Sequence, residues 1–202
     1  MLCRLALERE RAFEVTMLCF PPRKYELRQA STMNPDEPVF GADGAAMLDD
    51  ESQPAMRERV YRLLSQQPYG VLCVQGGGQP YGALVAYAFS EDLRHLVFTT
   101  PVSTRKYRLL SESAQVAFVV DSRSSDTDDL MELEAVTATG RAHLIDRGGE
   151  FEHWAELLVR RHSYLKSFVS AASVALFRID VVRFLHVVRF QEVRQWIPTD
   201  QS

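Results

Sequence analysis

The sequence predicts an α+β fold in which antiparallel strands form a closed or nearly closed barrel, with helices placed between them. The segments follow one another as a helix, three strands, a helix, two strands, two helices and two strands. Strands joined by short turns pair antiparallel, and many such strands favour a barrel. With 202 residues, 46% of them hydrophobic, the chain can bury the core of one sizeable domain.

Residues 1–50 differ from the rest of the chain and are predicted to be an N-terminal extension that is partly disordered. This part contains Pro21-Pro22, Pro35 and Pro38, leads into the acidic run Asp49-Asp50-Glu51, and shows no sustained hydrophobic period after residue 20. Charged residues among the first eleven positions interrupt any secretory hydrophobic segment. We therefore expect the folded domain to comprise residues 51–202.

The first half of this domain is expected to contain one helix and three strands. The helix starts after Ser52 and ends at Pro68-Tyr69-Gly70, and its apolar face is formed by Met56, Val60, Leu63 and Leu64. Strands are expected over residues 69–75, 81–89 and 95–100. The three glycines at 76–78 predict a hairpin turn between the first two strands.

The second half is expected to contain three helices and four strands. The first helix covers residues 104–113, and strands follow at 115–120 and 133–145. A helical region opens at Gly148-Gly149 and a short helix covers 163–169. Two last strands are expected over 173–179 and 182–196, the first with the alternation of a sheet covered on one face.

Composition argues against several classes of function. A net charge of −4 lacks the basic footprint of a nucleic-acid-binding protein, and no apolar run approaches the ~20 residues of a membrane span. The three cysteines form no C-x-x-C pair, which favours reduced thiols in a cytoplasmic protein. The five histidines show no metal-ligand spacing, so we expect no metal site.

One stretch joins a strand to a helix with side chains suited to holding a phosphate. The strand ends in Thr99-Thr100, and Pro101 cannot continue a central ladder. Ser103 or Thr104 can cap the next helix, which starts with Arg105-Lys106. A helix N-terminus offers unbonded N–H groups and the positive end of the dipole, and both favour an anion. The alternative is a surface turn with solvated charges.

These residues give the chain a resemblance to a known family. The run Phe98-Thr99-Thr100 followed by Ser103-Thr104-Arg105-Lys106 resembles the "F-x-T-…-S-R-K" segment of the pyridoxamine 5′-phosphate oxidase-like, FMN-binding split-barrel proteins. The resemblance covers residues 54–198. It implies an antiparallel six-stranded split β-barrel with flanking helices, FMN as cofactor, a homodimer, and oxidoreductase activity on a small-molecule substrate that the sequence does not identify.

The resemblance also implies cofactor-binding residues. Those expected to hold the FMN phosphate are Thr99, Thr100, Thr104, Arg105 and Lys106. The strand around Ala83, Leu84 and Val85, which is rich in small residues, is expected to line a slot for the isoalloxazine ring. Arg123 is expected near the flavin across a dimer interface. No catalytic acid or base is assigned, because the flavin ring itself carries the electrons.

The chain departs from the vitamin-B6 oxidases of this family at their substrate-binding positions. Ala83 and Ala88 stand where those oxidases carry an Arg and a Lys, and Arg183 and His186 have the wrong spacing for their R-x-H pair. We therefore expect FMN binding without oxidation of pyridoxamine phosphate. Two alternatives stay open: a non-catalytic flavin- or haem-binding protein, and a relative that uses a deazaflavin.

Overall fold

The computed structural model describes residues 53–122, 133–189 and 192–198, which belong to one compact unit. The helices are α2 (Gln53–Gln66), α3 (Arg105–Glu112), α4 (Gly149–Arg161) and α5 (Lys166–Ser170), with a 3₁₀ turn at Ser163–Leu165. The strands are β1 (Tyr69–Gly76), β2 (Gln79–Phe89), β3 (His95–Pro101), β4 (Gln115–Asp121), β5 (Glu134–Ile145), β6 (Val174–Val188) and β7 (Glu192–Trp196). The predicted extension over residues 1–50 lies outside the described residues.

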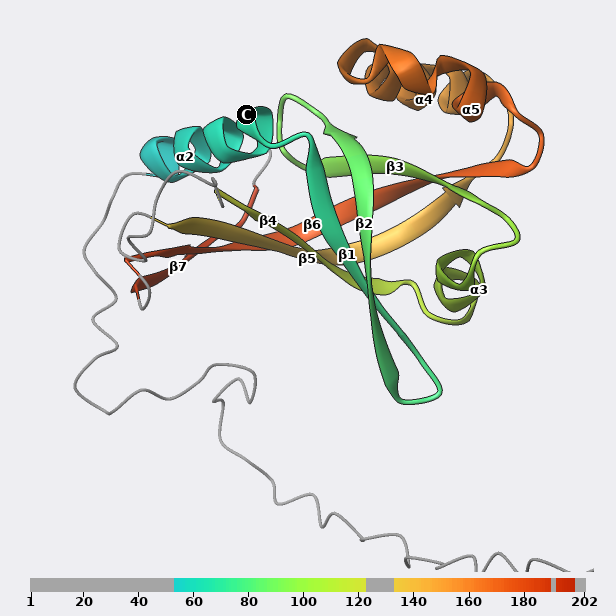
Figure 1. Cartoon of the computed structure of the whole chain (residues 1–202). Helices are drawn as coiled ribbons and strands as arrows, with labels where there is room; N and C mark the ends of the chain where they lie inside the picture. The colour runs from blue at the N-terminus through green and yellow to red at the C-terminus, as the bar shows by residue number, and fades with distance from the viewer. Residues whose placement is uncertain (1–52, 123–132, 190–191, 199–202) are drawn as a thin grey trace, which may run out of the picture. The chain divides into compact units, whose positions relative to one another are not determined.

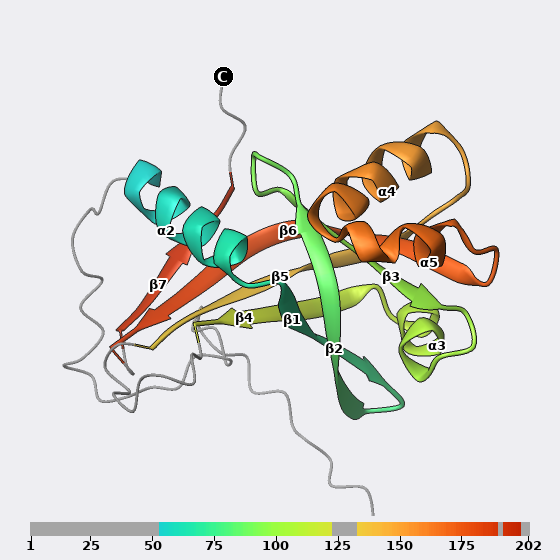
Figure 2. The same ribbon diagram turned by 45° about the horizontal axis from the view of Figure 1, so that its top comes forward.

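Six strands close into an antiparallel barrel (Figure 1). The strand order is β3-β2-β1-β4-β5-β6-β7, and a ladder between β3 and β6, from His95↔Asp180 to Pro101↔Val174, closes the barrel. Strand β7 pairs with the later part of β6, from Phe184 to Val188. Figure 2 shows α2 at one end of the barrel and α3 at the other. The predicted α+β fold, a six-stranded split barrel with flanking helices, is confirmed.

The predicted break between the last two strands, near residue 180, is wrong. Strand β6 continues through this point and is 15 residues long, from Val174 to Val188. Asp180 is tolerated there because its carboxylate accepts hydrogen bonds from Arg178 at 2.7 Å and pairs with His95 at 3.0 Å. The irregularity lies in the neighbouring strand, where the register shifts at Gly140 and a Cβ would come 2.3 Å from the Asp180 carbonyl oxygen. The chain leaves β6 only at Arg189, whose φ is 48°.

The main core fills the barrel, and α2 covers one of its ends. Its largest fully buried side chains include Leu72, Tyr87, Phe98, Phe118, Ile179 and Phe184. On α2, Val60, Leu63 and Leu64 are at most 1% exposed, as the helical spacing predicts. The hydroxyl of Tyr87 donates to the carbonyl of Leu64 at 2.9 Å, which ties the last turn of α2 to the barrel.

A second core lies between the barrel and the helices α4 and α5. Its members are Phe151, Trp154, Leu158 and Val169 from the helices and Ala88, Val97, Ile145 and Leu176 from the strands. Ala88 is 1% exposed, so this small residue lets α4 approach β2. None of the helices in the described ranges is long and apolar enough to cross a membrane.

Candidate functional site

The turn between β3 and α3 is held by a chain of hydroxyl hydrogen bonds. Thr104 is the N-cap of α3, with φ −83° and ψ 154°, and its Oγ1 accepts a hydrogen bond from the N–H of Tyr107. The same hydroxyl donates to the carbonyl of Pro101 at 2.9 Å. The Thr100 hydroxyl, 2.8 Å away, is therefore the donor to Thr104, because each hydroxyl has one proton.

This cap leaves part of the helix N-terminus open to an anion. Tyr107 N–H is bonded to the Thr104 hydroxyl and Arg108 N–H to the Thr104 carbonyl. The N–H groups of Arg105 and Lys106 are then the two in the first turn that the helix itself does not bond. They stand at the positive end of the α3 dipole.

The two cations of the turn sit in different surroundings. The Arg105 guanidinium is exposed and lies 5.1 Å from the centre of the Tyr81 ring. This is a cation–π contact, and it shows that the start of α3 lies next to β2. Lys106 is half-buried, and this burial lowers the pKa of its ammonium group. An anion bound beside Lys106 would offset that desolvation.

Strand β2 separates from β3 next to this turn. Among the described residues, the β2–β3 ladder has only three pairs, from Tyr87↔Phe98 to Phe89↔Leu96. The part of β2 from Gln79 to Ala86 pairs with β1 on its other side. Backbone groups on the free edge are available to the polar edge of a planar ligand.

The three predicted slot residues lie on that part of β2, where Leu84 points to the opposite side of the strand from Ala83 and Val85. Leu84 is 68% exposed on the outside of the barrel, Ala83 is half-buried, and Val85 is 6% exposed inside the core. Val85 can therefore meet a ligand only through its backbone. Ala88 is the other position, besides Ala83, at which the vitamin-B6 oxidases carry a charged residue. It is covered by α4, so this position does not face the slot.

Of the residues predicted to hold a phosphate, the structure places Thr100, Thr104, Arg105 and Lys106 at one turn, in different surroundings. Thr100 is fully buried and its hydroxyl is bonded to Thr104, so Thr100 positions the cap. Thr99, the neighbouring residue of β3, is half-buried on the opposite side of the strand. Arg123 lies outside the described residues. Sequence reasoning missed Tyr81, since nothing local to residue 81 shows that Arg105 will lie over its ring.

The outside of the barrel carries a largely apolar face across six neighbouring strands, from β2 to β7. Two rows of paired residues form it: Leu84, Val71, Val119, Thr137 and Leu185 in one, and Ala135, Val187 and Val193 in the other. Leu84 is 68% and Val193 50% exposed. We call these eight residues the outer face. Exposed apolar side chains gathered on one face are typical of an interaction site.

The histidines of the described residues do not form a metal site. Within the described ranges, no group of three or more His, Cys, Asp or Glu side chains could hold a metal ion. The two buried histidines have internal partners: His162 Nε2 lies 2.8 Å from the Tyr87 carbonyl, and His186 Nε2 lies 2.6 Å from Glu134.

Comparison with protein families gives one match. The family model described as pyridoxamine 5′-phosphate oxidase matches residues 56–185. The matched part includes the turn between β3 and α3 and all of β1 to β5, and it ends three residues before the end of β6. No curated protein sequence matches the chain.

Several solved structures share the fold. A haem-binding protein from Mycobacterium smegmatis is 16% identical with a TM-score of 0.63, and the match covers 70% of this chain and 57% of that chain. An FAD-binding protein from Mesorhizobium loti is 18% identical with a TM-score of 0.53, and the match covers 64% of this chain and 91% of that chain. ChuZ from Campylobacter jejuni is 7% identical with a TM-score of 0.62, and the match covers 70% of this chain and 59% of that chain. The chain spans less than two thirds of the length of the first and the third. At these identities the likeness concerns the fold alone.

Proposed function

The chain belongs to the pyridoxamine 5′-phosphate oxidase family, and from this premise we propose that it binds FMN at the start of α3 and acts as an FMN-dependent oxidoreductase on a small molecule. The observation that carries the proposal is the capped turn. It combines the Thr104 hydroxyl, two N–H groups and the side chains of Arg105 and Lys106 at one helix N-terminus.

The donor set fits a phosphate dianion. Two cations match its charge, the guanidinium can bond two phosphate oxygens at once, and the helix dipole adds a favourable field. The depressed pKa of Lys106, caused by burial, supports the same role, because a partly desolvated ammonium gains from an anionic partner. In a surface turn that binds no anion, the desolvation cost of the Lys106 ammonium group would not be offset.

The ring of the flavin would lie along β2. Its polar edge needs backbone donors and acceptors, and the stretch from Ala83 to Val85 offers them on an edge that β3 leaves unpaired. Bound FMN supplies the electron transfer. The residues of this chain hold the phosphate, orient the ring and exclude water from part of it.

A homodimer is part of the proposal. The outer face is largely apolar, and a second copy would cover its two exposed side chains, Leu84 and Val193. It would also complete the flavin site if Arg123 reaches across the interface, which stays a prediction. Cytoplasmic location likewise stays a prediction from the cysteine content.

The proposed substrate differs from pyridoxamine phosphate. Ala83 has no charge to bind a substrate phosphate, and Ala88 is covered by α4. An uncharged or weakly charged electron acceptor suits this strand better.

The second candidate function is a non-catalytic haem- or flavin-binding protein, since one structural neighbour is a haem-binding protein. The buried His162 and His186 are already hydrogen-bonded, which argues against either as an axial ligand in this conformation.

The experiment is the visible absorption spectrum of the purified protein, followed by mass spectrometry of the chromophore released on denaturation. The proposal predicts a two-band flavin spectrum and the mass of FMN. A Soret band would replace it with the haem candidate, and a deazaflavin mass would correct the cofactor. A colourless protein that stays colourless after incubation with FMN and removal of the excess would contradict both candidates.

A further inference from the structure

Tyr81 connects the two parts of the proposed FMN site. The centre of its ring lies 5.1 Å from the Arg105 guanidinium at the start of α3. Tyr81 also stands two residues before Ala83 on β2, and residues two apart in a strand share a face and are about 7 Å apart. Tyr81 therefore lies between the phosphate turn and the stretch of β2 that is expected to meet the flavin ring.

The barrel holds the Tyr81 ring in place. Tyr81 is half-buried and packs against the main core, and it pairs with Val74 of β1, which is 4% exposed. Strand β2 is paired with β1 from Gln79 to Ala86, so the backbone of Tyr81 is fixed on this side. Because the ring stands on a paired strand, its position is set before any ligand binds.

The contact with Arg105 belongs to a larger interface between α3 and the hairpin of β1 and β2. Arg105 and Leu109 are four residues apart on α3, so they lie on the same face of the helix. Leu109 packs against Gly76 at the end of β1, where a Cβ would overlap the Leu109 side chain. This face of α3 thus meets the hairpin at two points, Gly76 and Tyr81, and both hold the start of the helix next to β2.

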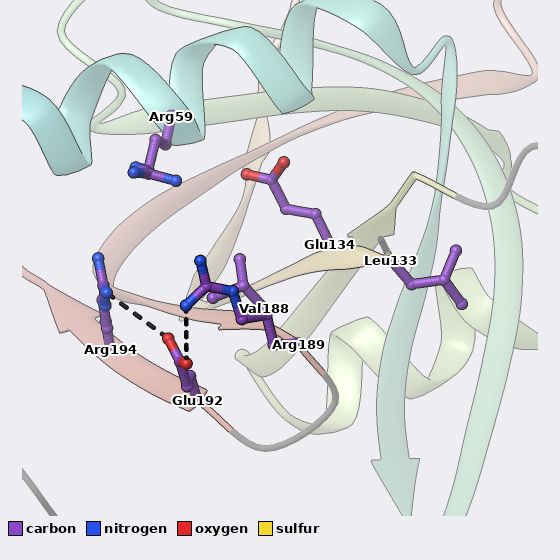
Figure 3. Close-up of a pocket in the computed structure, with 7 residues that line it drawn as sticks. All are labelled: Arg59, Leu133, Glu134, Val188, Arg189, Glu192 and Arg194. Carbon is purple, nitrogen blue, oxygen red and sulfur yellow. Dashed lines mark hydrogen bonds and ion pairs between the residues drawn. The ribbon is translucent and has the colours of Figure 1, made fainter. Parts of the chain in front are cut away.

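The ring attracts Arg105 without neutralising its charge. In a pocket of about 200 Å³ between α2 and the strands β6 and β7, Glu192 pairs with Arg189 at 3.2 Å and with Arg194 at 3.6 Å (Figure 3). A carboxylate partner of that kind would compete with a phosphate for the guanidinium. An aromatic ring attracts a cation through its quadrupole and has no net charge, so this contact leaves the positive charge of Arg105 available to an anion.

We propose that Tyr81 is the positioning residue of the phosphate turn: its ring places the Arg105 guanidinium for the FMN phosphate and thereby sets the preference for the phosphorylated flavin. The inference rests on the proposed FMN site. An arginine side chain has several rotatable bonds and loses conformational freedom when it is ordered by a ligand. A guanidinium that a ring has already placed loses less, so more of its attraction for phosphate appears as affinity.

The test measures the affinity of the full chain for FMN and for riboflavin by flavin titration. Two variants without the ring, Tyr81→Leu and Tyr81→Met, should each reduce the preference for FMN over riboflavin about threefold to tenfold. Tyr81→Phe keeps the ring and should keep the preference. The ratio of the two affinities isolates the phosphate, because a general disturbance of the flavin slot affects both flavins alike.

A double-mutant cycle with Arg105→Gln separates positioning from a general structural effect. If Tyr81 acts through Arg105, Tyr81→Leu should have no further effect on the preference in the Arg105→Gln background. Tyr61→Leu is the matched control, because Tyr61 on α2 is likewise half-buried and packed against the main core. It should keep the wild-type preference.

The outcomes distinguish this inference from the proposed function. A wild-type preference for FMN that Tyr81→Leu and Tyr81→Met leave intact would overturn the inference alone. The same holds if Tyr81→Leu loses as much preference in the Arg105→Gln background as in the wild type, or if Tyr61→Leu shows an equal loss. Equal affinity of the wild type for the two flavins would overturn the inference together with the proposed function.

Discussion

The hydroxyl oxygens of Thr100 and Thr104 lie 2.8 Å apart, so the buried end of β3 directly supports the residue that caps α3. The rigid core thus fixes the position of the helix start. A phosphate bound there meets N–H groups whose geometry is set before it arrives, and such preorganisation reduces the ordering cost of binding.

Replacing the cap tests this link. Thr104→Ala should lower the free energy of unfolding by about 1 kcal/mol and should also weaken FMN binding, because the first turn of α3 loses its anchor. Urea unfolding and a flavin titration measure the two effects. Thr104→Ser keeps the hydroxyl and should restore both; an unaltered FMN affinity in Thr104→Ala would show that the cap does not position the phosphate.

Arg161 provides a purely structural comparison. Its guanidinium donates to the carbonyls of Leu64 and Gln67 at the end of α2, the latter at 2.6 Å, and lies 4.7 Å from the centre of the Tyr87 ring. Arg161→Gln should cost about 1–3 kcal/mol of unfolding free energy, measured in urea.

The same variant should bind FMN with wild-type affinity at a temperature where it is folded. The neighbouring Arg160→Gln, which removes only an exposed i,i+4 contact to Glu156, should be within about 0.5 kcal/mol of wild type. A loss in Arg160→Gln as large as that in Arg161→Gln would refute the role given to Arg161.

Stability should depend on pH through the two buried histidines. Burial lowers the pKa of both His186 and His162 in the folded protein. As pH falls below about 6.5, the usual histidine value, the unfolded chain takes up protons that the folded chain does not. The free energy of unfolding therefore decreases, by at most ~1.4 kcal/mol per pH unit for each group.

Urea denaturation at pH 7.5, 6.5 and 5.5 measures this slope. His186→Gln should make the slope shallower, whereas Arg160→Gln, at an exposed position on α4, should leave it unchanged. The explanation fails if His186→Gln has the wild-type slope.

The outer face predicts the oligomeric state. Leu84→Glu places a charge where a second copy would pack, so the mass in solution, measured by light scattering after gel filtration, should change from dimer to monomer. Leu144→Glu makes the same change at a leucine that is 47% exposed but is not part of the outer face, and should stay dimeric. A monomeric wild type would exclude the dimer outright.

Local patterns in the sequence predicted the elements well, because strand alternation and helical spacing record which side chains are buried. The apolar face of α2 and the cap of α3 are examples, and both depend on residues within one or two turns of each other. The closing ladder between β3 and β6 and the contact of Arg105 with Tyr81 join distant segments. No local pattern encodes their register, so the sequence did not predict them.

Charged residues caused the clearest errors of interpretation. The predicted strands 173–179 and 182–196 left a break around Asp180, but its partners Arg178 and His95 come from the same sheet and keep this residue within β6. Arg161 and His162, at the end of α4, likewise find tertiary partners, because they bond to the backbone carbonyls of Leu64 in α2 and Tyr87 in β2. A charge pattern alone does not reveal which tertiary partner will compensate it.

The central claim is that Arg105 and Lys106 hold the phosphate of FMN, and the affinity for FMN relative to riboflavin tests it most directly. Riboflavin has the same ring without the phosphate. The wild type should bind FMN at least about 100-fold more tightly, and Arg105→Gln/Lys106→Gln should remove most of that preference while Arg160→Gln/Lys166→Gln, an equal change of charge on α4 and α5, keeps it. Equal affinity of the wild type for the two flavins, or an intact preference in Arg105→Gln/Lys106→Gln, would contradict the claim.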